Sequence, residues 1–120
     1  NADGSSTLVV ADKATDTTSP FASFDNGLDI NAADSIAVVV KLADGNMRAI
    51  QRFDADGAGG FTATEIARIG IGPITELPSF SPAINASGLV AFRAKDANGD
   101  AIYVGDGISL KRIAGNGDVV

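Results

Sequence analysis

The 120-residue chain contains no cysteine, no histidine and no tryptophan. Without cysteine it forms no disulfide and performs no thiol chemistry. Without histidine and cysteine it also lacks an imidazole base and the usual ligands of zinc and haem. No apolar run approaches the roughly 18 residues that a membrane-spanning helix needs, so we expect no membrane insertion.

Positive charge is scarce as well. Nine Lys+Arg stand against 15 Asp+Glu, which gives a net charge of -6 at pH 7. Proteins that follow a phosphate backbone need a surplus of lysine and arginine to neutralise it. We therefore expect no nucleic-acid partner.

The choice of polar residues indicates the fold class. Glutamate occurs twice, whereas aspartate occurs 13 times, glycine 14 times and asparagine 7 times. Aspartate, asparagine and glycine favour turns, whereas glutamate favours helices. Eleven isoleucines and nine valines favour strands. The composition predicts an all-β protein with short strands and tight turns.

The chain contains an internal repeat. Residues 30–46 align with residues 84–100 without a gap, and 7 of the 17 aligned pairs are identical. A further slip of two residues then aligns Ala49-Ile50 with Ala101-Ile102. A period near 50 residues is typical of propeller blades and other repeated sheets.

Each repeat is predicted to hold four short strands. The first strand ends at Ile30 or Ile84, and a turn built on Asn31 or Asn85 follows. The other strands are expected at residues 35–42, 47–53 and 62–69, and again at 89–95, 100–104 and 108–114. The fold class predicted is all-β, with two propeller-blade-like four-stranded antiparallel units; a single eight-stranded β-sandwich is the alternative. The predicted organisation is one repeat domain over 1–120, with repeat unit 1 at 20–70, repeat unit 2 at 78–115 and a stray strand from a preceding unit within 1–12.

One string in the second repeat resembles a known family. It reads Asn85-Ala-Ser-Gly88-Leu-Val-Ala91-Phe92-Arg-Ala94 and is followed by Gly105-Asp106-Gly107. It is similar to the N-x-x-G-x-x-A-F-x-A signature, with its G-D-G turn, of a bacterial exported tandem-repeat family. The first repeat departs from this pattern, because Asp34 replaces the glycine and Val38 replaces the phenylalanine. The resemblance implies a β-propeller-like fold and an extracellular or bacterial cell-surface location, and it implies no activity.

Two repeats are too few for a closed propeller, which needs about four blades or more. We therefore expect the chain to be a homo-oligomer or to pack against neighbouring repeats of a longer chain. Residues 6–11 have the form of a last strand without its own sheet. Such a strand pairs with an open sheet edge by β-augmentation.

The sharpest candidate for a binding site is the segment 54–65. It has the spacing of a twelve-residue calcium loop, with Asp54 at position 1, Asp56 at position 3 and Glu65 at position 12. Position 5 is Ala58, so one oxygen ligand is missing. The alternative interpretation is an enlarged glycine-rich hairpin loop. Calcium at Asp54, Asp56 and Glu65 is the one cofactor that the sequence suggests.

Other polar and aromatic residues have simpler interpretations. We expect Asp96, Asn98 and Asp100 to form a hairpin turn, and Asn85, although it begins a glycosylation sequon, to form an Asx turn like Asn31. Phe24 and Phe80 are expected in the core. The basic residues on strands are expected on solvated faces; they are Arg48, Arg52, Arg68, Arg93, Lys111 and Arg112.

No pair of carboxylates is marked by the sequence as the acid and nucleophile of a hydrolase, so we expect no enzymatic activity. The predicted function is a non-catalytic structural or interaction module of an exported bacterial surface protein. It would self-assemble through β-strand edges or blade faces. The alternative is a calcium-dependent glycan- or matrix-binding module.

Overall fold

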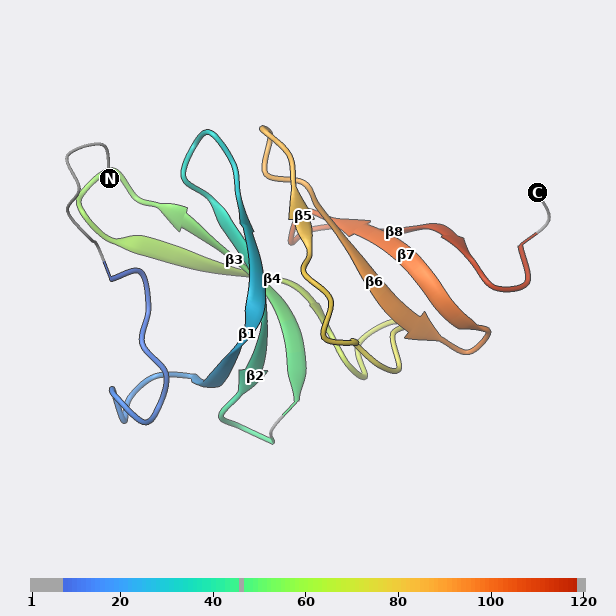
Figure 1. Ribbon diagram of the computed structural model, residues 1–120, viewed down its shortest axis with the longest axis horizontal. Coiled ribbons are helices and arrows are strands. Elements are labelled where there is room, and N and C mark those ends of the chain that lie inside the picture. The colour runs from blue at the N-terminus through green and yellow to red at the C-terminus, as the bar shows by residue number, and fades with distance from the viewer. Residues whose placement is uncertain (1–7, 46, 119–120) are drawn as a thin grey trace.

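The computed structural model describes residues 8–45 and 47–118, and the regular elements in these ranges are all β-strands. They form two four-stranded antiparallel sheets with the orders β1-β2-β3-β4 and β5-β6-β7-β8 (Figure 1). The prediction of an all-β fold with two such sheets is confirmed. The strands are β1 (Phe21–Ile30), β2 (Ile36–Leu42), β3 (Arg48–Ala55), β4 (Phe61–Arg68), β5 (Ala83–Ile84), β6 (Val90–Asp96), β7 (Gly99–Gly105) and β8 (Leu110–Gly115).

The two sheets repeat the same local geometry. In sheet 1 the register between β3 and β4 shifts at Ile50/Gln51, and in sheet 2 the register between β7 and β8 shifts at Ile102/Tyr103. These positions are 52 residues apart, as in the sequence alignment of the repeats. The bulge therefore occurs at equivalent places in both sheets, where it bends the strand and increases its twist.

The first strand is the main difference between the sheets. β1 spans ten residues, whereas β5 spans two. Earlier in the same segment Glu76 pairs with Lys95, whose equivalent in sheet 1, Lys41, pairs with β1. Pro78 and Pro82 lie between Glu76 and β5, and proline cannot donate a ladder hydrogen bond. The counterpart of β1 is therefore interrupted by proline.

The sheets stack on each other through unlike faces. We call face A the side that carries Val38 and Val40 in sheet 1 and Phe92 and Ala94 in sheet 2, and face B the opposite side. Face B of sheet 1 and face A of sheet 2 form one buried core, joined by the linker residues Ile74 and Leu77. Its members are Ala37, Val39, Ile50, Ile66, Ala67, Ile74, Leu77, Val90, Phe92, Ala94, Ala101 and Tyr103.

Face A of sheet 1 forms a second cluster on the far side of that sheet. Its buried members are Phe21, Val38, Val40, Leu42, Ala49 and Phe53. Val9 and Val10 pack against this cluster, but residues 8–11 form no strand. The predicted strand at residues 6–11 is therefore not formed in its described part, and residues 1–7 lie outside the described residues. Those valines cover the sheet with side chains rather than by strand pairing.

The repeat supplies a matched pair of substitutions that tests this packing. Ile50 on face B of sheet 1 is 1% exposed, whereas its equivalent Ile102 on face B of sheet 2 is 43% exposed. We expect Ile50→Ala to lower the free energy of unfolding by about 2–5 kcal/mol, because it leaves a cavity in the inter-sheet core. Ile102→Ala should cost less than about 1 kcal/mol.

Chemical denaturation of dilute protein measures both values. Equal losses for the two variants would contradict the assignment of Ile50, and not Ile102, to a buried interface.

Candidate functional site

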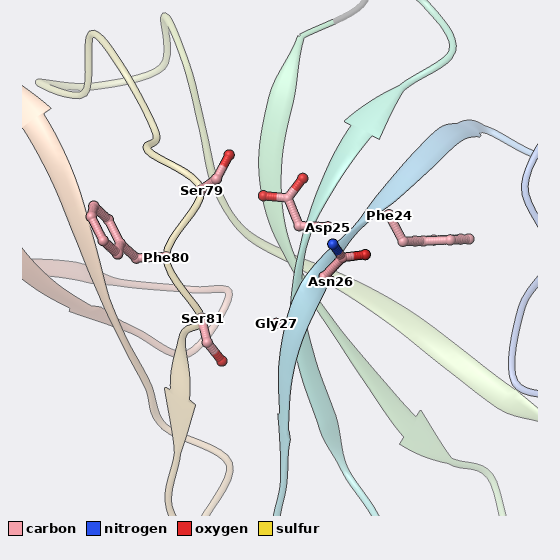
Figure 2. A pocket seen from close by; sticks show the side chains of 7 residues that line it. All are labelled: Phe24, Asp25, Asn26, Gly27, Ser79, Phe80 and Ser81. Carbon is pink, nitrogen blue, oxygen red and sulfur yellow. The ribbon is translucent and has the colours of Figure 1, made fainter.

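A polar groove lies at the junction of the two sheets (Figure 2). Its volume is about 260 Å³, and its lining is mostly polar. β1 supplies one wall and the segment before β5 supplies the other. The lining residues are Phe24, Asp25, Asn26, Gly27, Ser79, Phe80 and Ser81.

One arginine from β3 organises the groove. Arg48 donates through Nη2 to Oδ2 of Asp25 at 2.5 Å and to Oγ of Ser79 at 2.9 Å. Its Nε donates to the carbonyl oxygen of Leu77 at 2.8 Å. Figure 2 shows the Asp25 carboxylate directed toward the side where Ser79 lies. The only carboxylate of the groove lining is thus already neutralised by an ion pair that also ties β1 and β3 to the linker.

The two walls of the groove approach so closely that one position on β1 requires glycine. A Cβ atom on Gly27 would lie 2.8 Å from Cβ of Ser81, which is inside contact distance. Phe24 packs against the face A cluster of sheet 1, as expected for a core residue. Phe80, in contrast, is exposed, and its ring lies 4.5 Å from the guanidinium of Arg93. The prediction that Phe80 is a core residue is wrong.

A second arginine also joins the sheets. Arg52 on β3 donates through Nη1 to the carbonyl oxygen of Gly88 at 2.6 Å, and its Nε donates to Oδ2 of Asp54 at 3.0 Å. Its side chain is 16% exposed. The prediction that Arg48 and Arg52 lie on solvated faces is therefore wrong, because Arg48 donates from face B of sheet 1 to a carbonyl group of the linker and Arg52 to one of the next unit. No local pattern distinguishes them from the other basic strand residues.

The two asparagine turns are alike and touch each other. Oδ1 of Asn31 accepts from the backbone N–H groups of Ala33 and Ser35, and Oδ1 of Asn85 accepts from those of Ser87 and Leu89. These bonds confirm the Asx-turn interpretation of both asparagines. Asp34 adopts φ +63° where Gly88 adopts +86°, so the aspartate takes the left-handed conformation of the glycine that it replaces. In addition, Nδ2 of Asn31 donates to the carbonyl oxygen of Asn85 at 2.9 Å.

The predicted calcium ligands lie on different parts of the β3–β4 hairpin. Asp54 is on β3, Glu65 is on β4 and Asp56 is in the loop between the strands. Asp54 binds Ser35 and Arg52, Asp56 accepts from the N–H groups of Ala58 and Gly60, and Glu65 is paired with Arg68. Within residues 8–45 and 47–118 no group of three carboxylates is gathered around one point. The flanking segments are strands and not the helices of an EF-hand.

A polar cluster in sheet 2 joins β6, β7 and β8. Asp96 accepts from the N–H of Asn98 at 2.9 Å, from Nε of Arg112 at 2.9 Å and from the hydroxyl of Tyr103 at 3.0 Å. The hydrogen bond from Asn98, followed by those from Arg112 and Tyr103, holds the pKa of the Asp96 carboxyl below its ordinary value. Burial, together with the nearby Asp96, raises the pKa of Tyr103. Asp100 is turned away from this cluster and pairs with Arg93.

These sites share one chemical character. The carboxylates of the groove, of the β3–β4 hairpin and of the Asp96 cluster accept hydrogen bonds from arginine, hydroxyl or backbone donors of the same chain. Charge-assisted bonds of this kind fix strands, loops and sheets relative to one another. These bonds are suited to keeping the surface of the chain in one conformation.

Comparisons with known proteins give no relative from which a role could be transferred. No protein-family model, no curated protein and no solved structure matches this chain. The described residues include no helix that is long and apolar enough to cross a membrane. A role for the chain therefore has to be inferred from its own geometry.

A calcium titration tests the 54–65 segment. Because Asp54, Asp56 and Glu65 already have protein partners, we expect millimolar Ca²⁺ to leave the melting temperature unchanged. A ligand at 100 times its Kd would stabilise the fold by about 2.7 kcal/mol. A rise of several degrees that is lost in Asp56→Asn, with Mg²⁺ as the control ion, would contradict this expectation and establish a calcium site.

The lowered pKa of Asp96 predicts a pH dependence of stability. A carboxyl whose pKa is lower in the folded state stabilises the fold at any pH above its ordinary value of about 3.9, and this contribution disappears as the pH falls through the lowered value. Asp96→Asn should therefore melt several degrees below the unmodified chain at pH 7, and this difference should be smaller at pH 3. The exposed turn residue Asp34 provides the control Asp34→Asn, which removes the same charge and should leave the pH 7 melting temperature almost unchanged.

A loss of the same size for Asp96→Asn at both pH values would show that the charge of Asp96 does not stabilise the fold.

Proposed function

We propose that the chain is a non-catalytic structural module whose sheets join further copies of the same sheet face to face. In this proposal each sheet is a propeller-blade-like unit, and the module belongs to an exported bacterial surface protein. The low lysine content, the turn-rich acidic composition and the resemblance of the second repeat to an exported tandem-repeat family support the location.

One observation carries the proposal. Two sheets with the same strand order and the same bulge pack through unlike faces, face A of one on face B of the other. A contact between unlike faces is heterologous, so face A of sheet 1 lies at one end and face B of sheet 2 at the other. Val9 and Val10 cover part of this face A, and Leu28 and Ile30 remain exposed on it. A module built in this way can accept another unit at either end.

The free face B has the chemistry of a contact surface. Ile102 is exposed on it and Val104 and Ala91 are partly exposed, and a shallow hollow of about 290 Å³ lies beside Ile102. The hollow is lined by Arg93, Asp100, Ala101, Ile102, Ala114 and Gly115. Arg93 occupies the position on face B of sheet 2 that is equivalent to Val39 in sheet 1. Its guanidinium forms an ion pair with Asp100 and lies over the ring of Phe80. Apolar side chains grouped on one sheet face mark it as an interaction site.

Self-association in solution tests the proposal. We expect sedimentation velocity to show mass increasing with protein concentration, and Ile102→Asp to weaken the association at least about tenfold, because it places a charge in an apolar contact. Ile71 is a matched control, since it is also exposed but lies in the turn after β4. Ile71→Asp should associate like the unmodified chain.

A chain that stays monomeric at all concentrations would contradict the proposal, because face B of sheet 2 would then bind no second copy. Equal weakening by both substitutions would contradict the assignment of the contact to face B.

A further inference from the structure

We propose that face B of sheet 2 binds face A of sheet 1 of a second copy of this chain, head to tail. This inference rests on the proposed function and adds which two surfaces meet and in which orientation. The contact would reproduce between two copies the joint that the chain already contains between its own sheets.

Equivalent positions on face B of the two sheets differ in exposure. Ile50 and Ala67 on sheet 1 are buried under sheet 2. Their equivalents on sheet 2, by the register of the strands, are Ile102 and Ala114, and both are exposed. Burying a large aliphatic side chain is favourable by about 1.5–3 kcal/mol. Sheet 2 therefore presents the surface that sheet 1 uses to bind a face A.

The same comparison identifies the surface at the other end. Leu28 and Ile30 at the end of β1 are 55% and 53% exposed on face A of sheet 1. Their equivalents 54 residues later are Pro82, which is buried, and Ile84, which packs into the inter-sheet core. Both free faces thus carry apolar residues whose equivalents are covered inside the chain. Face B of sheet 2 and face A of sheet 1 therefore carry the same kinds of apolar residues as the two faces that meet inside the chain.

A hydrogen bond at the edge of the joint gives the direction of stacking. Inside the chain, Nδ2 of Asn31 donates to the carbonyl oxygen of Asn85. Among the described residues no acceptor is bound to Nδ2 of Asn85, and the carbonyl oxygen of Asn31 accepts only from the N–H of Asp34. A free donor therefore stands at one end and a free acceptor at the other. Head-to-tail stacking would pair Asn85 with Asn31 of the second copy and continue the ladder.

The segment that precedes β1 is compatible with this joint. Val9 and Val10 pack against the face A cluster of sheet 1 and leave Leu28 and Ile30 exposed. In the joint inside the chain, the linker residues Ile74 and Leu77 likewise lie between the sheets. A stretch of chain before the first strand is thus part of the internal joint, and Val9 and Val10 would take the same place in the proposed one.

A two-fold arrangement fits these observations less well. Packing face B of sheet 2 on the same face of a second copy would cover Ile102 but leave Leu28 and Ile30 in water. It would also place two Asn85 side chains at the joint, and neither would have the carbonyl oxygen of Asn31 as an acceptor. The isologous arrangement is therefore the competing outcome of the test.

The absence of native cysteine allows a direct cross-linking experiment. Ala32 and Ala86 are exposed equivalents next to Asn31 and Asn85. The variants Ala32→Cys and Ala86→Cys are purified separately, mixed, and treated with a short bismaleimide. The double variant Ala32→Cys/Ala86→Cys calibrates the reaction, because its two thiols lie at the joint inside one chain and should be linked intramolecularly.

Head-to-tail stacking predicts a covalent dimer in the mixture, at a yield at least about tenfold above that of either variant alone. Adding Ile102→Asp to the Ala86→Cys variant should remove this dimer. If Ala86→Cys links to itself as efficiently as the mixture does, the stacking is two-fold and the inference is wrong. If sedimentation shows association but the mixture gives no dimer, the inference also fails while the proposed function stands; if the chain stays monomeric, both fail.

Discussion

The burial of face A of sheet 2 on face B of sheet 1 is the interaction on which the rest of the structure depends. Sheet 1 is apolar on both faces, with Val38 and Val40 on one and Val39 and Ile50 on the other. A sheet of this kind is stable in water only when both faces are covered. Sheet 2 covers one face of sheet 1, and Val9 and Val10 contribute to covering the other. Among the described residues, sheet 2 is covered on one face only, and Ile102 is exposed on the other.

Polar contacts at the joint define how the sheets sit on each other. Arg48, Arg52 and Asn31 each donate from sheet 1 to a carbonyl oxygen of the following unit or of the linker before it. Asp29 accepts from the N–H of Ile84 at 3.0 Å. Removing one partner of such a bond leaves a poorly solvated polar group, at a cost of about 1–3 kcal/mol. Apolar burial drives the stacking, and these bonds select one orientation.

Much of the fold could be predicted from the sequence because strands and turns are local features. Alternating aliphatic residues and glycine-containing turns located the strands from β2 to β4 and from β6 to β8 to within two residues. Asn31 and Asn85 were predicted as turn residues because their side chains bond to backbone only a few positions away. Features that depend on distant residues were missed. Arg48 and Arg52 look like any basic strand residue until their partners in the next unit are known.

The segment 54–65 shows that the spacing of acidic residues does not by itself determine the local fold. It has acidic residues where a calcium loop needs them, but it folds as two strands with a loop between them. Asp54 and Glu65 consequently lie on opposite strands, and each has its own arginine. The first strand of each repeat is predicted as a short strand that ends at Ile30 or Ile84. β5 agrees with this prediction, whereas β1 spans ten residues and is longer than predicted.

The central claim, that face B of sheet 2 binds face A of sheet 1 of a second copy, is tested most directly by methyl NMR of isoleucine-labelled protein in a dilution series. The account predicts that the methyl signals of Ile30 and Ile102 shift together as concentration rises, while those of the buried Ile50 and of the turn residue Ile71 stay in place. Shifts confined to Ile71, or shifts of Ile102 without Ile30, would contradict it.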